Sequence, residues 1–491
     1  MTHNRHGRAT LRRTVAVLSG RTARFVGRLL GRGGTSLPGL VAARVDPTLV
    51  PALASELGPV ILAVGTNGKT TTARLIARIL RDVQGAPPIA NRSGANLEQG
   101  IASSLLSMAD LRGDLRQPGR AAVFEVDELA LDGVLKIIRP TAIVATNLFR
   151  DQLDRYGEVD TIVDRWSAAF AGTATTTLAI CSDDPRLEQL AAASGLRTIR
   201  FGLDPGTVAP TSVGEDPTAP TIVPDDPVSD PVSCPVCGAA LQFAWHSIGQ
   251  LGDYACPDGH FRRPAPDVSV SIGQLHPGDG HGQRARATTR YAFRGAFGSA
   301  EASVQLAGPS GAYDAAAAVS AAMAIGVDPC VAIHALEGAT PAFGRLEEVR
   351  LHGRRVVLAL AKNPASLTES EAIAAAQKPD GILLGLSDEP ADGRDVSWIW
   401  DVDFDALSAV PMIGLTGTRA DDLALRFKYS ARAVAGRWPI VATEPHVDRA
   451  LEAMLGRVPR GGTLIVLATY TALLGIRRSL HRRGVVSAIP T

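Results

Sequence analysis

The sequence predicts an α/β protein in which two sheets of mainly parallel strands follow one another along the chain. Short apolar runs alternate with helical patterns from Pro59 to about residue 185, and the same alternation returns between residues 345 and 491. Strands of a parallel sheet are buried on both faces and read as continuous apolar runs, and the connections between them are usually helices. A proline-rich stretch and a cluster of cysteines separate the two series. We therefore expect an α/β domain with an insertion, followed by a second α/β domain.

The composition is that of a globular protein. The chain has 491 residues, 45 % of them hydrophobic, and a formal net charge of +1, and this length suits about three domains. The near-balanced charge excludes polyanion binding through overall charge. No apolar stretch reaches the roughly 18 residues that a membrane span needs, so we expect a cytoplasmic protein. Three of the five cysteines are clustered, which indicates a metal site in a reducing compartment and not a disulfide framework.

Residues 1–45 form a basic N-terminal segment. Eight arginines punctuate an apolar pattern there: Arg5, Arg8, Arg12, Arg13, Arg21, Arg24, Arg28 and Arg32. Arg21 and Arg24 interrupt the apolar core that a signal peptide would need. One alternative is a basic amphipathic helix in peripheral contact with the inner face of a membrane. The other, which we favour, is a helix that packs on the next domain and ends at the glycines of residues 31–34.

The central domain, which we bound at residues 46–340, begins with a phosphate-binding loop. Residues 64–72 read VGTNGKTTT directly after an apolar run. The usual pattern is G-x-x-x-x-G-K-[ST], and only its first glycine is missing, because Ala63 stands there. Backbone N–H groups and the start of a helix near Lys69 would face an anion. The candidate nucleotide ligands are Gly65, Thr66, Asn67, Gly68, Lys69, Thr70 and Thr71. Strand, turn and helix signals occur in the required order, which disfavours the alternative of a glycine-rich surface turn.

Polar residues follow the next two strands of this domain. Glu125 comes directly after the apolar run 121–124, and Asn147 follows the run 141–145, with Asp151 and Asp154 further on. Acidic residues at strand ends beside a phosphate-binding loop are where α/β nucleotide sites place magnesium ligands. Taken singly, each acid is better explained as a solvated loop carboxylate. We favour Glu125 because it follows its strand immediately, and we expect it to hold Mg²⁺ together with the Thr70 hydroxyl.

An insertion at residues 232–263 carries the cysteine cluster. Residues 203–233 contain seven prolines and predict an irregular linker. The linker leads to Cys234 and Cys237 in a C-x₂-C turn, and Cys256 and His260 follow. Thiolates on a tight bend occupy two positions of a tetrahedral zinc site, so these four residues predict a structural zinc ribbon. A ribbon that has lost its metal is the alternative, because Gly259 stands where a fourth cysteine would be. Only Arg262 and Arg263 are basic in this region, which argues against nucleic acid as a partner.

Residues 345–491 predict a second doubly wound α/β unit of Rossmann type. The expected strands are residues 355–360, 381–386, 411–415, 439–442 and 463–468, with helices between them. The first of these strands leads into Lys362, Asn363 and Pro364. A loop between the strands reads DGRDVSWIWD from Asp392 to Asp401 and combines two tryptophans with several aspartates. A well-packed connection with solvated acids is its plain interpretation.

These motifs, in this order, resemble the Mur ligase family and, within it, the MurT subunits of lipid II isoglutaminyl synthases. The broad resemblance rests on GTNGKTTT, Glu125, Asn147 with residues 151–154, residues 183–185, and Gly344 with Arg345. The narrower one rests on residues 91–97, the inserted ribbon, residues 362–364, the DGRDVSWIWD loop and residues 469–472. The similarity runs from about residue 35 to the C-terminus. It implies a Mur ligase-like P-loop central domain followed by a Rossmann-like C-terminal domain.

The resemblance also implies an activity. Members of this branch use ATP and Mg²⁺ to amidate the α-carboxylate of D-glutamate in the lipid II stem peptide through an acyl phosphate. A GatD-type glutaminase partner supplies the ammonia, and lipid II is the substrate. Lys69 would neutralise phosphate charge, Asn147 would belong to the nucleotide site, and Arg345 and Lys362 would add charge contacts. Asp395, with Asp401 as second choice, would serve a Cys–His pair of the glutaminase.

The chain also departs from the family patterns. Gln152 stands where a histidine is usual, and no lysine lies near Trp166 and Ser167. The acidic residue that precedes Lys362 in the family motif is absent, and Gly311 and Asp314 replace asparagines. Two other readings remain open: an amino-acid-adding Mur or folylpolyglutamate-type ligase, and a non-enzymatic zinc-ribbon protein with a vestigial nucleotide fold. Both are less well supported, because neither accounts for the ribbon together with the DGRDVSWIWD loop.

Overall fold

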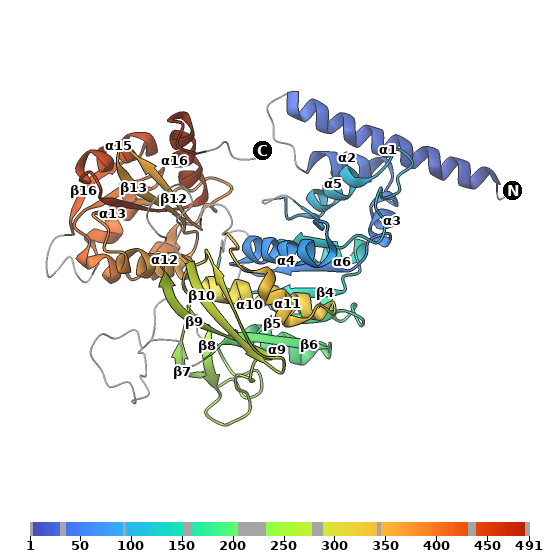
Figure 1. Cartoon of the computed structure of the whole chain (residues 1–491), viewed down its shortest axis with the longest axis horizontal. Coiled ribbons are helices and arrows are strands. Elements are labelled where there is room, and N and C mark those ends of the chain that lie inside the picture. Colours follow the sequence, from blue (N-terminus) through green and yellow to red (C-terminus); the bar gives the residue numbers. More distant parts are fainter. Residues whose placement is uncertain are drawn as a thin grey trace.

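The protein is described by a computed structural model (Figure 1). The described residues are 3–29, 36–91, 95–151, 159–204, 232–276, 288–340, 345–430 and 438–486. The glycines of residues 31–34 and most of the expected proline-rich linker lie outside these ranges. Figure 1 shows the C-terminal domain (orange to red) beside the central domain, with a small hairpin at the lower end of the central domain.

A nine-stranded sheet forms the centre of the first domain. Its order is β11-β10-β9-β6-β5-β4-β1-β3-β2. The strands are β1 (Val60–Val64), β2 (Ile89–Ala90), β3 (Ala122–Glu125), β4 (Ala142–Ala145), β5 (Thr177–Cys181), β6 (Thr198–Leu203), β9 (Val268–His276), β10 (Thr288–Gly295) and β11 (Gly298–Val304). The strands from β2 to β9 pair in parallel, and β9, β10 and β11 pair antiparallel. The parallel part confirms the predicted fold class, whereas the antiparallel extension was not foreseen.

The register of this sheet brings the predicted phosphate-binding residues together. Ala63 of β1 pairs with Glu125 of β3, and Val64 pairs with Ala145 of β4. The carboxyl ends of the three strands therefore lie side by side at one edge. Glu125 and Asn147 consequently flank the loop that follows β1.

Helices cover both faces of the sheet. They are α4 (Lys69–Gln84), α5 (Glu98–Met108), α6 (Leu131–Ile137), α8 (Val159–Phe170), α9 (Pro185–Ser194), α10 (Gly308–Ala324) and α11 (Pro329–Ala335). Helix α10 is the central one, because it contacts α4 and strands β4, β5, β6 and β9. Its residues from Gly311 to Ala322 are all buried. Small alanine side chains allow this close approach of a helix to the sheet.

The N-terminal segment is helical, as predicted. It comprises α1 (His3–Leu29) and α2 (Leu37–Val45), and α3 (Leu49–Ser55) follows at the start of the central domain. Helix α1 packs on α2 and α5, and its Ala16 and Val17 are fully buried. The favoured alternative, a helix packed on the central domain, is therefore confirmed. Among the described residues, no helix is both long and apolar enough to cross a bilayer.

The insertion forms a hairpin of β7 (Gln242–His246) and β8 (Gly252–Ala255). It has a small core of its own, made by Cys234, Leu241, Tyr254 and Cys256. Arg263 ties it to the central sheet, because its Nε lies 2.8 Å from the Asp183 carboxylate. Asp183 is completely buried and also accepts hydrogen bonds from the Tyr313 hydroxyl and the Leu203 amide. This predicted motif residue is thus a structural junction between insertion, sheet and α10.

The C-terminal domain contains a six-stranded sheet of order β12-β13-β17-β14-β15-β16. Its elements are β12 (Arg345–Leu351), β13 (Arg354–Leu360), α12 (Pro364–Ala376), β14 (Gly381–Gly385), η2 (Ser397–Asp401), η3 (Phe404–Ala409), β15 (Ile413–Thr416), α13 (Ala420–Lys428), β16 (Ile440–Glu444), α15 (Val447–Arg457), β17 (Thr463–Ala468) and α16 (Tyr470–Arg482). All five predicted strands are present, and all pair in parallel. The additional strand β12 pairs antiparallel at the edge.

Candidate active site

The loop after β1 has the geometry of a phosphate-binding loop. β1 ends at Val64 and α4 begins at Lys69, as the sequence predicted. Gly65 and Gly68 adopt φ of 122° and 88°, a region that residues with a Cβ rarely occupy. A Cβ on Gly68 would also lie 2.1 Å from the Asp314 carboxylate. The two glycines thus let the backbone turn its N–H groups toward one point at the start of α4.

Lys69 lies inside this loop. Its Nζ donates hydrogen bonds to the carbonyl oxygens of Gly65 and of Thr66, the latter at 3.3 Å, and forms an ion pair with Glu128 at 3.0 Å. Burial alone would lower the pKa of Lys69, but the carboxylates of Glu128 and Glu125 outweigh burial and raise it. The side chain is therefore a buried, permanently charged ammonium group at neutral pH.

Thr70 and Glu125, the predicted magnesium ligands, are adjacent. The Thr70 hydroxyl donates a hydrogen bond to the Glu125 carboxylate at 2.8 Å. Asn91 fixes the backbone of Glu125, since its side chain accepts from the Glu125 N–H and donates to its carbonyl oxygen. Burial raises the pKa of Glu125 and outweighs the Lys69 cation and the Thr70 hydrogen bond, both of which lower it. A hydroxyl and a carboxylate beside a phosphate-binding loop fit a magnesium ion, which prefers hard oxygen ligands.

Asn147 braces the loop from β4. Its side-chain oxygen accepts from the Asn67 N–H at 2.8 Å, and its amide donates to the Asn67 carbonyl oxygen at 3.1 Å. The Thr66 N–H in turn donates to the Asn147 carbonyl oxygen at 2.9 Å. The structure thus gives Asn147 a positioning contact with the loop. Thr71 is also buried at this place, and within the described residues its hydroxyl has no hydrogen-bond partner.

The C-terminal domain reaches the same loop through the residues that follow β13. Lys362 Nζ donates to the Thr66 carbonyl oxygen at 3.1 Å and forms an ion pair with Asp151 at 2.5 Å. The side chains of Asn67 and Asn363 exchange two hydrogen bonds, at 3.3 and 3.1 Å. Lys362 therefore lies where the sequence analysis expected a cation. Arg345, the other expected cation, begins β12, but its side chain lies outside the described residues.

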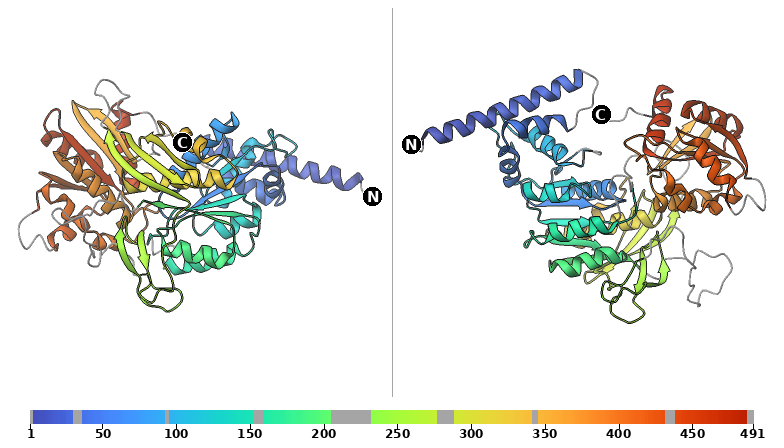
Figure 2. Two further views of the ribbon diagram at one scale, coloured as in Figure 1. Left: turned by 60° about the horizontal axis from the view of Figure 1, so that its bottom comes forward. Right: turned by 180° about the vertical axis from the view of Figure 1, so that it is seen from behind.

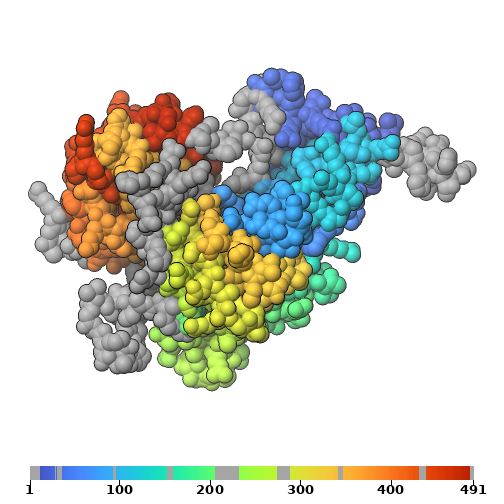
Figure 3. Space-filling view, viewed as in Figure 1, coloured from blue at the N-terminus to red at the C-terminus, as the bar shows by residue number. Residues whose placement is uncertain are grey.

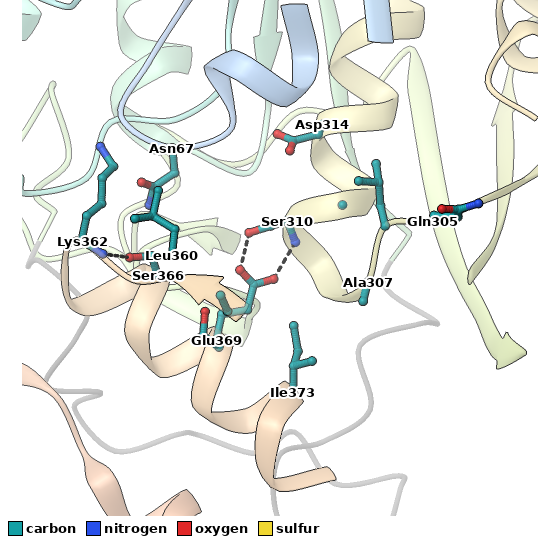
Figure 4. Close-up of a pocket in the computed structure, with 14 residues that line it drawn as sticks. Asn67, Gln305, Ala307, Ser310, Asp314, Leu360, Lys362, Ser366, Glu369 and Ile373 are labelled. Atoms are coloured by element: carbon teal, nitrogen blue, oxygen red, sulfur yellow. Dashed lines mark hydrogen bonds between the residues drawn. The ribbon is translucent and has the colours of Figure 1, made fainter. Parts of the chain in front are cut away.

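A pocket opens beside this contact, between α10 and α12 (Figure 4). Its lining includes Asn67, Asp314, Leu360, Lys362, Ser366 and Ile373. Glu369 of α12 crosses toward the start of α10, where its carboxylate accepts from the Ser310 N–H at 2.8 Å and from the Ser310 hydroxyl. The pocket thus combines an apolar wall with a few polar groups, and it borders the phosphate-binding loop at Asn67. This composition is typical of small-molecule sites.

The DGRDVSWIWD loop follows β14. The carboxyl end of β14 lies at the same edge of the C-terminal sheet as the end of β13 that leads to Lys362. Asp392 is buried and accepts from the Thr471 N–H at 2.8 Å. Asp395, the first candidate for the partner, is half-buried and accepts from the Ser397 N–H at 2.8 Å. Asp401, the second candidate, instead forms an ion pair with Arg150 of the central domain at 2.9 Å. Trp400, which precedes Asp401, is 48 % exposed.

The four predicted zinc ligands form one cluster. The ligand atoms of Cys234, Cys237, Cys256 and His260 all lie within 4.8 Å of one another. Tetrahedral zinc with Zn–S bonds of about 2.3 Å places its ligand atoms roughly 3.8 Å apart. The cluster therefore fits zinc in size and in ligand chemistry. Four protein ligands would leave no open coordination position, as in structural sites.

Three contacts of the site are not predicted from the sequence. Glu128, the partner of Lys69, ends the acidic run that starts at Glu125. This run is the feature of the sequence from which Glu128 could have been predicted as a site residue. Nothing in the sequence pointed to the pairing of Asn67 with Asn363 or of Arg150 with Asp401, because each joins two domains. Of the residues that carried the resemblance, 92–94, 152–154 and Gly344 lie outside the described residues.

Two family models match the chain. The Mur ligase middle domain matches residues 64–226, which contain the phosphate-binding loop, Glu125 and Asn147. The MurT ligase C-terminal model matches residues 360–473, which contain Lys362, Asn363 and the DGRDVSWIWD loop. The two matches thus cover both sides of the candidate site.

Known proteins resemble the chain over nearly its whole length. It is 29% identical over 476 residues to the MurT subunit of the glutamine-hydrolyzing lipid II isoglutaminyl synthase of Staphylococcus aureus strain COL, covering 96% of this chain and 98% of that protein. The MurT subunit of Streptococcus pneumoniae is also 29% identical, over 97% of this chain and 98% of that protein. Among solved structures, a pseudomurein peptide ligase type C from Methanothermus fervidus has a TM-score of 0.62 at 18% identity, covering 87% of this chain and 79% of that chain. At this identity the structural likeness concerns the fold.

Proposed function

We propose that this chain, which belongs to the Mur ligase family and carries a MurT-type C-terminal domain, is the ATP-dependent subunit of a lipid II isoglutaminyl synthase. It would amidate the α-carboxylate of D-glutamate in the lipid II stem peptide to D-isoglutamine. The observation that carries the proposal is the meeting of the phosphate-binding loop with Lys362 and Asn363 of the MurT-type domain. We also propose the domain boundaries 1–45, 46–340 with the insertion 232–263, and 345–491.

The chemistry follows from the poor reactivity of a carboxylate. One carboxylate oxygen attacks the γ-phosphorus of ATP, so that an acyl phosphate and ADP form. Ammonia then attacks the acyl carbon, the C–O bond to phosphate breaks, and loss of a proton leaves the amide. The protein has to align carboxylate and phosphate, balance the transferred charge and exclude water from the intermediate.

Lys69 is the residue we assign to charge balance. It is charged, buried, and bonded to carbonyl oxygens of the loop in which the phosphates would lie. Thr70 and Glu125 would hold Mg²⁺, which supplies further charge neutralisation at the phosphates. Lys362 and Arg345 would add positive charge from the C-terminal domain. The loop residues from Gly65 to Thr71 would bind phosphate oxygens through their N–H groups and hydroxyls.

We assign the nucleoside part of ATP to the pocket between α10 and α12. The pocket borders Asn67 of the phosphate-binding loop, and its apolar lining includes Leu306, Leu360 and Ile373. Apolar walls suit a flat base, and the hydroxyls of Ser310 and Ser366 are among its polar groups. Asp314 lies in this pocket and replaces an asparagine of the family pattern, so base contacts here would differ in detail from the family pattern.

Ammonia would come from a glutaminase partner of GatD type. Outside the ribbon the chain has only Cys181 and Cys330. Cys181 is completely buried, and burial raises its pKa, so it is unsuited to nucleophilic attack. Cys330 follows Pro329 in the first turn of α11 and lacks a nucleophile elbow. We therefore propose that the partner provides a Cys–His pair and that Asp395 orients its histidine across the interface, with Asp401 as second choice.

We further propose that the Cys₃His cluster holds structural Zn²⁺ and that the protein works in the cytoplasm. A substrate linked to a lipid carrier would bring it to the inner face of the membrane. Such a substrate requires peripheral contact of the protein with the membrane.

Turnover of ATP tests the proposed function. The full chain with its glutaminase should hydrolyse ATP only when lipid II and either ammonia or glutamine are present, and mass spectrometry should show a stem peptide that has exchanged –OH for –NH₂. Turnover that requires a free amino acid would instead indicate an amino-acid-adding ligase. The absence of turnover with every substrate would favour the non-enzymatic alternative.

A further inference from the structure

We propose that the outer face of α1 is a docking surface for anionic lipid bilayers. The surface consists of six apolar side chains, Leu11, Val15, Leu18, Phe25, Val26 and Leu29, which we call the α1 stripe. The inference rests on their exposure, their spacing and the surrounding charge. It needs neither the ATP site nor the glutaminase, so it stands independently of the proposed function.

The α1 stripe runs along the helix from Leu11 to Leu29, with the exposed Thr22 between Leu18 and Phe25. Leu11, Phe25 and Leu29 are 66%, 64% and 71% exposed, and the other three members are between 44% and 48% exposed. With about 3.6 residues per turn, these positions fall on one side of the helix. Ala16, Val17 and Gly20 are buried on the opposite side, where α1 packs on α2 and α5. Single exposed leucines are ordinary, whereas a row of six along one helix marks an interaction surface.

The charged side chains of the N-terminal segment itself are all positive. Residues 1–45 contain nine arginines and no aspartate or glutamate. The whole chain carries +1, so the other 446 residues carry a net charge of 41 − 49 = −8. An anionic surface would attract the N-terminal segment and repel the rest of the protein. This asymmetry would turn the α1 stripe toward the membrane.

Two arginines hold α1 in place beside the stripe. The guanidinium of Arg12 donates to the Val45 carbonyl oxygen at 3.0 Å, and that of Arg21 donates to the Ala109 carbonyl oxygen at 2.8 Å. Both bonds join α1 to the rest of the N-terminal half, so a docked helix would hold the central domain at the bilayer. Figures 1 and 2 show α1 as an outlying element of the central domain, and in Figure 3 its described side chains lie at the margin of the molecule.

A lipid surface fits these features better than other occupants. Two copies of α1 facing each other would bring together two segments of +9 with no acid to balance them, which opposes a symmetric dimer. Nucleic acid would use the arginines but would leave the apolar row without a partner. A helix that lies in the interface plane uses both, because its apolar face enters the acyl boundary while basic groups contact the headgroups. The short span of exposed apolar groups agrees with docking parallel to the membrane.

Sedimentation with vesicles tests the proposal. The full-length chain is mixed with vesicles of equal parts phosphatidylglycerol and phosphatidylcholine, or of phosphatidylcholine alone. We expect at least about tenfold tighter binding to the anionic vesicles, and we expect high salt to weaken it, because basic residues supply much of the attraction. No ATP, glutamine or lipid II is needed, so failure here is distinguishable from failure of the proposed function.

The decisive variant replaces Leu11, Leu18 and Phe25 by glutamine. All three side chains are exposed, so folding should be unaffected. A matched control replaces Val83, Val331 and Leu425, which are exposed apolar residues on other helices. The stripe variant should lose at least about tenfold in vesicle affinity, and the control variant should bind as the wild type does.

Three outcomes would overturn the proposal. The first is that the wild-type protein does not bind anionic vesicles. The second is that the stripe variant binds them as tightly as the wild type. The third is a wild-type dimer, seen by light scattering, that the stripe variant converts to a monomer while vesicle binding is absent. That result would assign the α1 stripe to a second copy of the chain. Equal unfolding transitions of wild type and variant establish that the comparison is between folded proteins.

Discussion

The ammonium group of Lys69 is held in position by carbonyl oxygens and by one carboxylate. Its ammonium group is bonded to its own loop and to Glu128, so it needs no large rearrangement to meet an anion in the loop. Electrostatic groups that are already oriented contribute strongly to catalysis, because no energy is spent on orienting them during the reaction.

Lys69→Ala should abolish amidation with ammonia as well as with glutamine. The loss of a buried cation at the transferred phosphate should lower kcat by at least about 100-fold. Steady-state rates with both nitrogen sources measure this. Lys136→Ala is the control, because Lys136 is an exposed lysine on α6 and should retain full activity. A Lys69→Ala protein with a tenth of wild-type activity would refute the assignment.

The protonation of a single residue, Asp184, should measurably affect the free energy of unfolding. It caps α9 by accepting from the Arg186 N–H at 3.0 Å, and it accepts from the Leu148 N–H at 2.8 Å. Burial nevertheless raises the pKa of Asp184 from 3.8 to about 6. Between these two values the folded chain binds more protons at this site than the unfolded chain. The free energy of unfolding should therefore fall, through this group, as the pH rises from about 4 to about 6.

Asp184→Asn should remove this pH dependence, because asparagine also caps helices but does not titrate. A shift of about two pKa units corresponds to about 3 kcal/mol. The difference in unfolding free energy between variant and wild type should therefore change by up to about this amount, in favour of the variant, across that pH range. Denaturant titrations at several pH values measure it. Asp328→Asn is the control, since Asp328 caps α11 and also precedes a proline but is exposed. A constant difference for Asp184→Asn across this range would contradict the prediction.

At the scale of elements, the ribbon depends on its cysteine turns for a core. Only four residues form its buried cluster, and Cys234 and Cys256 are two of them. So small a core gives little hydrophobic stabilisation, and a metal would supply what is missing.

Metal analysis should find about one zinc per purified chain, and Cys237→Ser should lose it. Removing one of four ligands breaks the tetrahedral site and should destabilise the hairpin, which limited proteolysis between residues 232 and 263 would detect. Cys330→Ser is the control, because Cys330 is exposed on α11 and far from the ribbon in sequence. If protein prepared without chelator contains no zinc, the proposed zinc site is ruled out.

The DGRDVSWIWD loop offers a second test at this scale. Asp395 accepts from the Ser397 N–H, and Asp403 accepts in the same way from the Asp405 N–H. The two aspartates thus make the same local contact, Asp403 as the N-cap of η3 and Asp395 one residue before the N-cap of η2. They differ in the role we propose, because only Asp395 would meet the glutaminase.

Asp395→Asn should lower glutamine-driven amidation by at least about 100-fold, by analogy with removal of a triad acid. Amidation by free ammonia and assembly of the complex should stay intact. Asp403→Asn is the matched control, because it loses the same local acceptor charge without losing a partner contact. If glutamine and ammonia drive amidation by the Asp395→Asn protein at equal rates, Asp395 is only a loop residue.

Elements were more predictable than the contacts between them. The five C-terminal strands and the phosphate-binding loop follow from local apolar runs and glycine positions, which are properties of short segments. Strand β12 was missed because its alternation of arginine and glutamate with apolar residues is that of an edge strand. The antiparallel strands β9 to β11 were missed for another reason, since their apolar residues are interspersed with polar ones and do not form the continuous apolar runs of buried parallel strands.

At the scale of the whole molecule, the site is a contact between two domains. Asn67 with Asn363, Lys362 with Asp151, and Arg150 with Asp401 all join the central and C-terminal domains. No periodicity or spacing encodes such pairs, because the partners are separated by more than 200 positions in the sequence. The resemblance placed Lys362 at the site, but it could not identify the acceptors of Lys362 or the partner of Asp401.

A test of the ion pair between Arg150 and Asp401 separates two roles of Asp401, one in the contact between the domains and one in the contact with the glutaminase. Its side chains are 35% and 37% exposed, so the pair should contribute about 0.2–1 kcal/mol. Because the pair helps to seat the C-terminal domain on the phosphate-binding loop, we expect Asp401→Asn to lower ammonia-driven kcat/KM by about two- to fivefold. The ratio of glutamine-driven to ammonia-driven rates should not change.

A double-mutant cycle with Arg150→Ala completes this test. If the pair acts as a unit, the double variant should be no worse than the poorer single variant. Asp395→Asn serves as the reference with the opposite pattern, since it should change the ratio of the two rates and leave ammonia-driven turnover unchanged. Should Asp401→Asn instead lower only the glutamine-driven rate, Asp401 would be the aspartate that serves the partner. The interdomain ion pair would then be a feature of the isolated subunit that gives way when the glutaminase binds.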